Sequence, residues 1–195
     1  MPIIDDIRAI INPDTYIEVI NYGKDGKIVL EETDKQAKLK KVTLRGFDAQ
    51  QTFAFKLDIQ GKKISEYLNP AHDKINKGCD GVIFTKIAKQ WYVFICELKS
   101  GKPEENKYLL QFRNTRVFVK FISGILEEFY NLTINFELKY VLFDKMQKNR
   151  FNKTPTKGEK IEPEIISINN IKLAIYKIHH LDEQEFFNMR HLKLN

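Results

Sequence analysis

The stretch from residue 79 to residue 100 constrains the fold most, because it reads as two strands joined by a short turn. β-Branched, aromatic and other apolar residues fill both halves, and the apolar pattern breaks between Ala88 and Lys89. In an antiparallel hairpin centred between those two residues, Asp80 faces Glu97. The two carboxylates are therefore predicted to lie on one face of a sheet, about 5 Å apart at Cβ.

This hairpin is apolar on both of its faces. Lys99 shares the face of the two acids, because side chains alternate along a strand. The apolar residues on that face are Val82, Phe84, Trp91, Val93 and Ile95, and those on the opposite face are Ile83, Tyr92, Phe94, Cys96 and Leu98. Such a hairpin is predicted to lie in the centre of its sheet, covered on both sides.

Two carboxylates in apolar surroundings repel each other, so the pKa of at least one rises unless a cation lies between them. A divalent metal resolves this conflict, because hard cations bind carboxylate and carbonyl oxygens. The backbone carbonyl of Leu98, between Glu97 and Lys99, is the candidate for a third ligand. The alternative is that two acids at the end of the sheet pair with Lys99, which accounts for one acid and leaves the other unexplained.

The pattern of Asp80, sixteen intervening residues and then Glu97-Leu98-Lys99 resembles the active-site signature of the PD-(D/E)XK nuclease superfamily. The matching features are an acid at the start of one strand and E-x-K near the end of the next. Cys79 stands where many members have a proline. The resemblance covers about residues 27–145. It implies an α/β (α+β) fold with a restriction-endonuclease-like core, a central mixed β-sheet flanked by helices.

The activity implied by this resemblance is metal-dependent hydrolysis of phosphodiester bonds in nucleic acid, with DNA favoured over RNA. Asp80, Glu97 and the Leu98 carbonyl would hold Mg²⁺ or Mn²⁺, and Lys99 would position water and neutralise charge on the phosphate. Two alternatives use the same scaffold: a catalytically inactive nucleic-acid-binding module and a protein-interaction subunit. A homodimer is also compatible, because cutting both strands of a duplex commonly takes two active sites.

Four further residues are candidates for the site, each with a structural alternative. Glu66 lies upstream, where the superfamily often places another acid on a helix, and a surface helix position explains it equally well. Gln111 resembles a glutamine that some members carry early in the long helix, and capping or solvent exposure is an equal alternative. Arg113 and Arg116 form a phosphate-binding pair or the solvent-facing side of that helix.

Residues 144–164 form a basic segment that contains Pro155 and Gly158 and lacks periodicity. Four of its cations are candidates for contacts with a phosphate backbone: Lys148, Arg150, Lys153 and Lys157. A solvated connection between ordered elements is the alternative.

The rest of the chain predicts a coarse order of elements. Residues 1–22 have helical spacing, and three strands are predicted at residues 27–31, 41–44 and 53–59, the last with one polar face. A long helix is predicted over residues 104–130, with an apolar stripe that belongs to the core. The predicted later elements are a strand at 136–143, a strand pair at 165–168 and 173–178, and a short helix containing Phe186, Phe187 and Met189.

Composition and length complete the expectations. The 195 residues suit one nuclease-like domain, residues 1–195, whose C-terminal strands and short helix occupy residues 165–195. A formal charge of +6 and a pI near 9.1 mildly favour a polyanionic partner. No stretch approaches eighteen apolar residues and residues 1–12 lack the pattern of a signal peptide, so we expect no membrane partner and a cytoplasmic location.

The cysteines and histidines are expected to be structural. Cys79 and Cys96 are predicted to be buried and unpaired on the same face of the hairpin. The histidines, which show no ligand spacing with a carboxylate partner, are His72, His179, His180 and His191.

Overall fold

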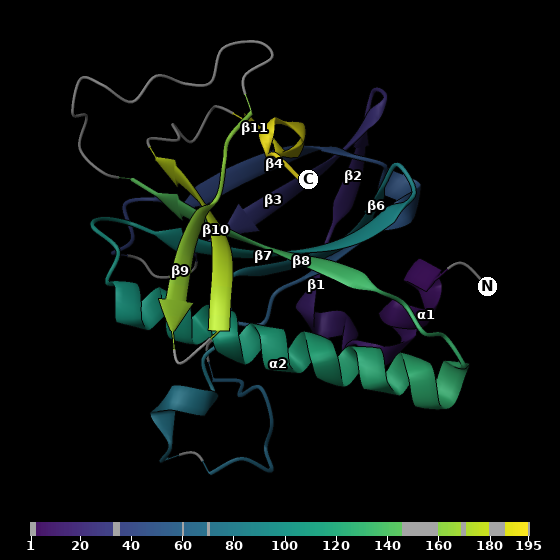
Figure 1. Cartoon of the computed structure of the whole chain (residues 1–195), viewed down its shortest axis with the longest axis horizontal. Coiled ribbons are helices and arrows are strands. Elements are labelled where there is room, and N and C mark those ends of the chain that lie inside the picture. Colours follow the sequence, from purple (N-terminus) through teal and green to yellow (C-terminus); the bar gives the residue numbers. More distant parts are fainter. Residues whose placement is uncertain are drawn as a thin grey trace.

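The computed structural model describes residues 3–32, 36–59, 61–69, 71–145, 160–168, 171–179 and 186–194. Across these residues the chain forms an α+β fold with two mixed β-sheets and two α-helices (Figure 1). The predicted combination of helices with a mixed sheet is confirmed at this level.

The larger sheet has seven strands. Their order is β1 (Tyr16–Ile17), β5 (Thr52–Phe55), β6 (Gly81–Ile87), β7 (Gln90–Lys99), β8 (Phe136–Asp144), β10 (Ile171–His179) and β9 (Glu164–Ile168). β5, β6 and β7 are antiparallel neighbours, whereas β8 runs parallel to β7 and β10 runs parallel to β8. Parallel neighbours need a long crossover, and the helix α2 (Glu105–Tyr130) provides it between β7 and β8.

The smaller sheet has four strands, in the order β11 (Phe186–Asn188), β4 (Lys41–Phe47), β3 (Asp25–Glu31) and β2 (Val19–Tyr22). Burial alternates along β3 and β4, so each strand has one apolar face and one outer face. Short 3-10 helices lie at Pro13–Thr15, Ala49–Gln51, Asp73–Ile75 and Met189–His191.

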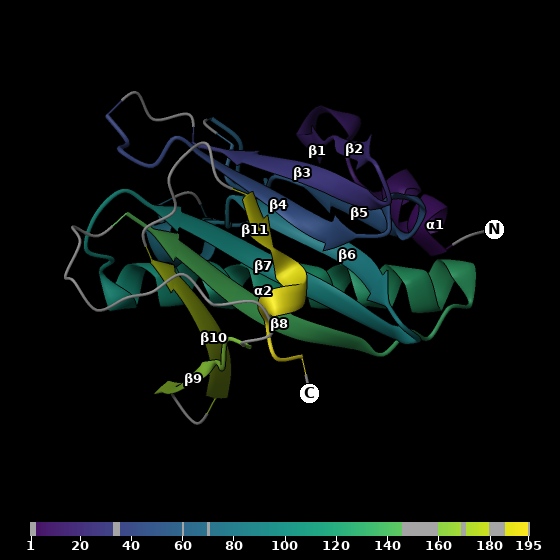
Figure 2. The ribbon, with the colours of Figure 1, turned by 90° about the horizontal axis from the view of Figure 1, so that it is seen from above.

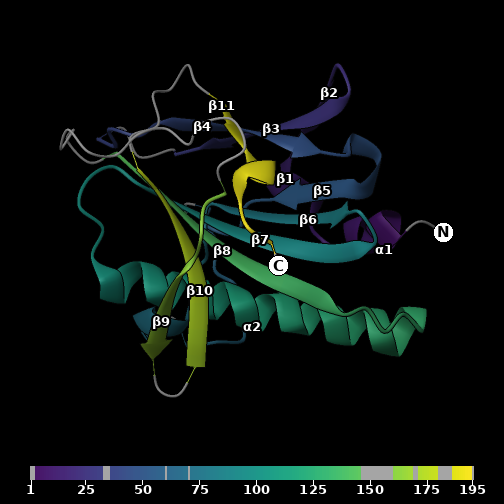
Figure 3. The same cartoon turned by 45° about the horizontal axis from the view of Figure 1, so that its top comes forward.

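The molecule has three layers. The helices α1 (Ile3–Ile10) and α2 cover one face of the seven-stranded sheet, and the four-stranded sheet covers the other (Figure 3). α1 and the β9–β10 hairpin lie toward opposite ends of the molecule (Figure 2). The prediction of a sheet flanked by helices is therefore right for one face only, because a second sheet provides the apolar cover on the other.

The hairpin β6–β7 has the predicted register and the predicted place in the middle of its sheet. Gly81 pairs with Cys96 and Ile87 pairs with Gln90, so the turn falls between Ala88 and Lys89. Ala88 has a φ of 56°, the left-handed conformation that a tight turn requires there.

The two faces of the hairpin separate the two apolar clusters, as the alternation predicts. The buried residues against α2 include Val82, Phe84, Val93 and Ile95. Those between the sheets include Ile83, Tyr92, Phe94, Cys96 and Leu98.

Two predictions near the N-terminus are wrong in part. α1 agrees with the helical spacing, but the chain from Tyr16 to Tyr22 forms strands β1 and β2, because its β-branched residues pair with β5 and β3. β5 lacks the predicted polar face, since all four of its residues are buried. Phe53 and Phe55 pack in the cluster under the helices and Ala54 packs between the sheets, so both faces of β5 are covered.

Of two predictions near the C-terminus, one is confirmed and the other is wrong. The strand pair β9–β10 is confirmed as an antiparallel hairpin. The predicted short helix is wrong, because Phe186 and Phe187 lie in β11, which pairs in parallel with β4, while Met189 begins a 3-10 turn. The competing partner, β4, lies far away in the sequence, so local spacing could not reveal it.

The cysteines are buried and unpaired, as predicted. They do not share a face, however, because Cys79 packs in the cluster under α2 and Cys96 packs between the sheets. Cys79 precedes β6, where the strand alternation does not yet apply.

The long helix has the predicted range and ends at Asn131, whose φ of 52° is left-handed. Its stripe is only partly core. Phe112, Ile122 and Leu126 are buried, whereas Val117, Phe121 and Phe129 are exposed. The stripe predicted from spacing is therefore wider than the face of α2 that contacts the sheet.

Replacing Phe112 by alanine should destabilise the fold strongly, because its ring is fully buried and lies 5.3 Å from the ring centroid of Tyr140. We expect a loss of about 3–5 kcal/mol in the free energy of unfolding, measured by denaturant titration. Phe121→Ala is the matched control on the same helix, at a residue that is 63% exposed, and should change stability by less than about 0.5 kcal/mol. Equal losses for the two variants would contradict the assigned packing of α2.

Candidate functional site

The candidate site lies at the open end of the β6–β7 hairpin. Asp80 directly precedes β6 and Glu97 lies near the end of β7, and both are almost completely buried, with 2% and 1% of their surface exposed. The paired register of the hairpin ends at Gly81 and Cys96, and Asp80 and Glu97 are the next residues on the two sides. Asp80 Oδ2 accepts a hydrogen bond of 2.8 Å from the backbone N–H of Leu98.

The side chains of Lys99 and Gln111 form hydrogen bonds on the Glu97 side of the site. The Nζ of Lys99 donates to Glu97 Oε1 and, at 3.0 Å, to Gln111 Oε1. The amide nitrogen of Gln111 donates to the backbone carbonyl of Gly78 at 3.0 Å. Gln111 therefore extends from α2 into the site and fixes the position of Lys99, so it is neither a helix cap nor solvent-exposed.

One oxygen of the buried acids has no partner. Glu97 Oε2 is inaccessible to solvent and lacks a hydrogen bond within the described part of the chain. Burying such an atom without a hydrogen bond lowers the stability of the fold by about 1–3 kcal/mol, or more when the atom carries charge. An unpaired buried oxygen therefore indicates a position where a ligand can bind. Pairing with Lys99 satisfies only Oε1, and a cation is the partner that an unsatisfied carboxylate oxygen favours.

The backbone of Leu98 is oriented to take part. Its N–H points to Asp80, and the N–H and C=O of one strand residue point to the same side of the strand. The Leu98 carbonyl therefore faces the Asp80 side of β7. Over the described ranges, no group of three or more His, Cys, Asp or Glu side chains gathers as a metal site. The donor set that fits a cation here is thus two carboxylates with a carbonyl.

Burial and mutual repulsion control the charge of the two acids. Burial raises the pKa of Asp80 from 3.8 to about 6, although the Leu98 N–H bond opposes this shift. Burial, and then the charge of Asp80, raise the pKa of Glu97 from 4.5 to about 8. Without a metal, Glu97 therefore binds a proton near neutral pH, and a cation would have to displace it.

Asp58 is a further charged residue beside the site, and the sequence patterns did not single it out. Asp58 follows β5, and its backbone N–H donates to the carbonyl of Cys79 at 3.1 Å. Burial is the main cause that raises the pKa of Asp58, while the charge of Lys56 opposes it. The only signal in the sequence was a charge at the end of a predicted strand, which is common on protein surfaces.

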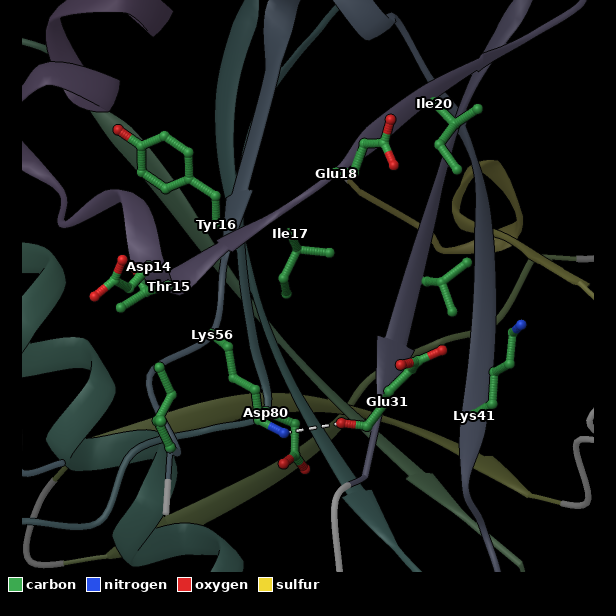
Figure 4. A pocket seen from close by; sticks show the side chains of 12 residues that line it. Asp14, Thr15, Tyr16, Ile17, Glu18, Ile20, Glu31, Lys41, Lys56 and Asp80 are labelled. Carbon is green, nitrogen blue, oxygen red and sulfur yellow. Dashed lines mark hydrogen bonds between the residues drawn. The ribbon is translucent and has the colours of Figure 1, made fainter. Parts of the chain in front are cut away.

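A cleft leads to Asp80 from the edge of the two sheets (Figure 4). Its volume is about 530 Å³. Lys56 bridges it by donating from Nζ to the backbone carbonyl of Glu31 at 2.8 Å. The lining residues are Asp14, Thr15, Tyr16, Ile17, Glu18, Ile20, Val29, Glu31, Lys41, Lys56, Ile59 and Asp80. A ligand in this cleft would reach one of the two buried acids.

Other sequence candidates lie elsewhere. Glu66 is exposed in a non-helical segment and forms an ion pair of 3.5 Å with Lys63, so the expected helix around it is wrong. Arg113 and Arg116 are half-buried on α2. The described structure shows neither arginine in an ion pair with Asp80 or Glu97. The basic candidates Lys148, Arg150, Lys153 and Lys157 lie outside the described residues.

One histidine differs from the expectation. His179, at the end of β10, lies with Nδ1 2.8 and 2.9 Å from the two carboxylate oxygens of Asp144, at the end of β8. His179 therefore has a carboxylate partner that the sequence could not reveal, because β8 and β10 are separated by the basic segment. Lys99 pairs in register with Asp144, so these groups continue the same end of the sheet.

Comparisons with known protein families, with characterised proteins and with solved structures found no match to this chain. Among the described helices, none is both long enough and apolar enough to cross a membrane.

Without metal, the protein should lose stability as the pH rises from about 5 to 8. Both acids have raised pKa values, so in this range the folded state binds more protons than the unfolded chain, and the free energy of unfolding falls. The slope should reach about 1.4 kcal/mol per pH unit for each group within its own window. Denaturant titrations in a chelator at several pH values measure it.

Glu97→Gln should flatten this pH dependence, since the amide keeps the shape of the side chain and has no proton to lose. The control is Glu127→Gln, at an exposed position on α2, which should retain the wild-type slope. A wild-type protein that gains stability between pH 5 and 8 would show that the two acids are not buried together.

Proposed function

We propose that this chain is a metal-dependent nuclease that hydrolyses phosphodiester bonds in nucleic acid, with DNA as the better substrate. The observation that carries this proposal is the unpartnered Oε2 of Glu97, buried beside Asp80 and Lys99 at the end of a central hairpin. This chemistry is what the resemblance of Asp80 and Glu97-Leu98-Lys99 to the PD-(D/E)XK signature implies.

The order of elements supports the same proposal. The strand β5, the hairpin β6–β7, the long helix α2 and the strand β8, which runs parallel to β7, come in this order along the chain. A core of strand, hairpin, helix and strand is the order expected of the superfamily. The restriction-endonuclease-like assignment of this core is part of the proposal.

In this proposal Asp80, Glu97 and the Leu98 carbonyl hold the ion, Mg²⁺ or Mn²⁺. When bound, the ion supplies Lewis-acid stabilisation of charge on the phosphate. Lys99 provides a fixed ammonium that donates to the attacking water or to a phosphate oxygen. Gln111 keeps this ammonium in place, because its Oε1 accepts from Nζ and its amide is itself fixed by Gly78.

The direct test is incubation of the purified protein with plasmid, linear duplex, single-stranded DNA and RNA, each with and without Mg²⁺. Cleavage that requires Mg²⁺ supports the proposal. Binding of nucleic acid without cleavage, and without heat of Mn²⁺ binding in calorimetry, would replace it with a catalytically inactive binding module. Failure to bind any nucleic acid would leave a protein-interaction subunit on this scaffold.

Lys99→Ala and Glu97→Ala should separate catalysis from metal binding. Lys99→Ala should reduce the cleavage rate by about a hundredfold or more while Mn²⁺ affinity changes little, because the ammonium is not a ligand. Glu97→Ala should abolish both cleavage and Mn²⁺ binding. Lys107→Ala, at an exposed position on α2, is the control and should cleave normally. A Lys99→Ala variant with wild-type cleavage would remove Lys99 from the mechanism.

The basic segment of residues 144–164 is proposed to contact the phosphate backbone. Neutralising Lys148, Arg150, Lys153 and Lys157 together should weaken binding to all duplex sequences alike. Each lost contact should reduce the slope of log affinity against log salt by about 0.9. The slope is measured in a chelator, which prevents cleavage, and an unchanged slope would identify the segment as a solvated connection.

A further inference from the structure

Two exposed aromatic rings enclose a guanidinium on the outer face of the four-stranded sheet. Tyr22 on β2 and Phe186 on β11 are 52% and 50% exposed. The guanidinium carbon of Arg45, on β4, lies 3.9 Å from the centroid of each ring. We refer to Tyr22, Arg45 and Phe186 as the stacked trio. Its members come from three strands, so the tertiary structure brings the flat groups together.

The stacked trio is not arranged for stability alone. The Nε of Arg45 is buried and has no hydrogen-bond partner within the described ranges, which costs free energy. Both rings nevertheless keep about half of their surface open to solvent. A local arrangement that accepts such a cost is expected at a functional site more often than elsewhere. What the trio offers to a ligand is flat apolar surface next to positive charge.

The charges around the trio favour an anionic ligand. The acids of β3 lie at its two ends, where Asp25 forms an ion pair of 2.7 Å with Arg190 and Glu31 pairs in register with Lys41. In the middle of the sheet, Lys27 pairs in register with Arg45, so two cations lie side by side there. The centre of this face is therefore positive, and the acid at one margin, Asp25, is paired with Arg190.

The same face continues into the cleft described above. The outward-facing residues Ile20, Val29 and Lys41 belong to the four-stranded sheet and also line the cleft that ends at Asp80 (Figure 4). The sheet face and the cleft therefore share one continuous surface that ends at Asp80.

We propose that the outer face of the four-stranded sheet binds single-stranded nucleic acid. Bases stack on Tyr22 and Phe186, and the phosphates lie near Lys27 and Arg45. Flat exposed rings beside cations are what a single strand needs, whereas the bases of a duplex are stacked on each other and cannot reach them. The continuation of the strand toward Asp80 rests on the proposed nuclease function, but binding to the sheet does not.

The test is the affinity for a fluorescent oligothymidylate of about 12 nucleotides, measured by anisotropy in a chelator. Tyr22→Ala and Phe186→Ala should each weaken binding by at least about fivefold, the lower end of the effect of base–aromatic stacking. The control is Tyr67→Ala, which removes a fully exposed ring from outside the sheet and should bind normally. Thermal unfolding verifies that each variant is folded.

A second measurement uses the wild-type protein, so it does not depend on the variants. A strand of the same length with abasic sugars keeps the phosphates and removes the bases, and it should bind at least about fivefold more weakly. A blunt duplex should also bind more weakly than the single strand. Equal affinity for the normal and abasic strands, or folded trio variants with wild-type affinity, would overturn the proposal. These binding tests do not depend on cleavage, because they are made in a chelator. If the protein passes them but cleaves no nucleic acid with Mg²⁺, the proposed nuclease function is wrong and the proposed binding surface stands.

Discussion

The structure depends on the burial of one hairpin between two apolar layers. The strands β6 and β7 contribute alternate residues to the cluster under α2 and to the cluster between the sheets. A hairpin covered on both faces has no exposed side on which to place charge, yet its open end carries Asp80 and Glu97. The unfavourable burial of these acids raises their pKa values, so that a proton or, in the proposed function, a metal ion offsets their charge. Fold and proposed chemistry therefore meet at the same pair of side chains.

The surroundings of the pair distribute its hydrogen bonds unequally. Asp80 is partly satisfied by the backbone of Leu98, and Glu97 by Lys99, which Gln111 holds in turn. Of the carboxylate oxygens of this pair, Glu97 Oε2 is the one that is buried without a partner among the described residues. An ion pair made only for stability would not need a glutamine to orient the lysine, nor would it leave an acceptor unsatisfied. This asymmetry supports the proposal of a metal site over the alternative of two acids that share a lysine.

The second sheet gives the molecule a surface of a different kind. Its inner face completes the core, and its outer face carries the stacked trio and continues into the cleft toward Asp80. In the proposed function, one sheet places the reacting groups while the other guides the strand. The two sheets differ in this way because of burial. The proposed reacting acids are shielded from water at the end of one sheet, whereas stacking on bases requires rings that remain exposed on the other.

The sequence by itself determined the features that depend on local periodicity: the β6–β7 register, the two faces of the hairpin, the range of α2, and the convergence of Asp80, Glu97 and Lys99. It could not determine features that depend on partners distant in the chain. Phe186 and Phe187 became a strand because β4 was available, Asp58 and His179 gained their neighbours through sheet pairing, and part of the apolar stripe of α2 stayed exposed. Alternation within a strand is a local geometric rule, whereas the choice of what covers a face is made by the whole fold.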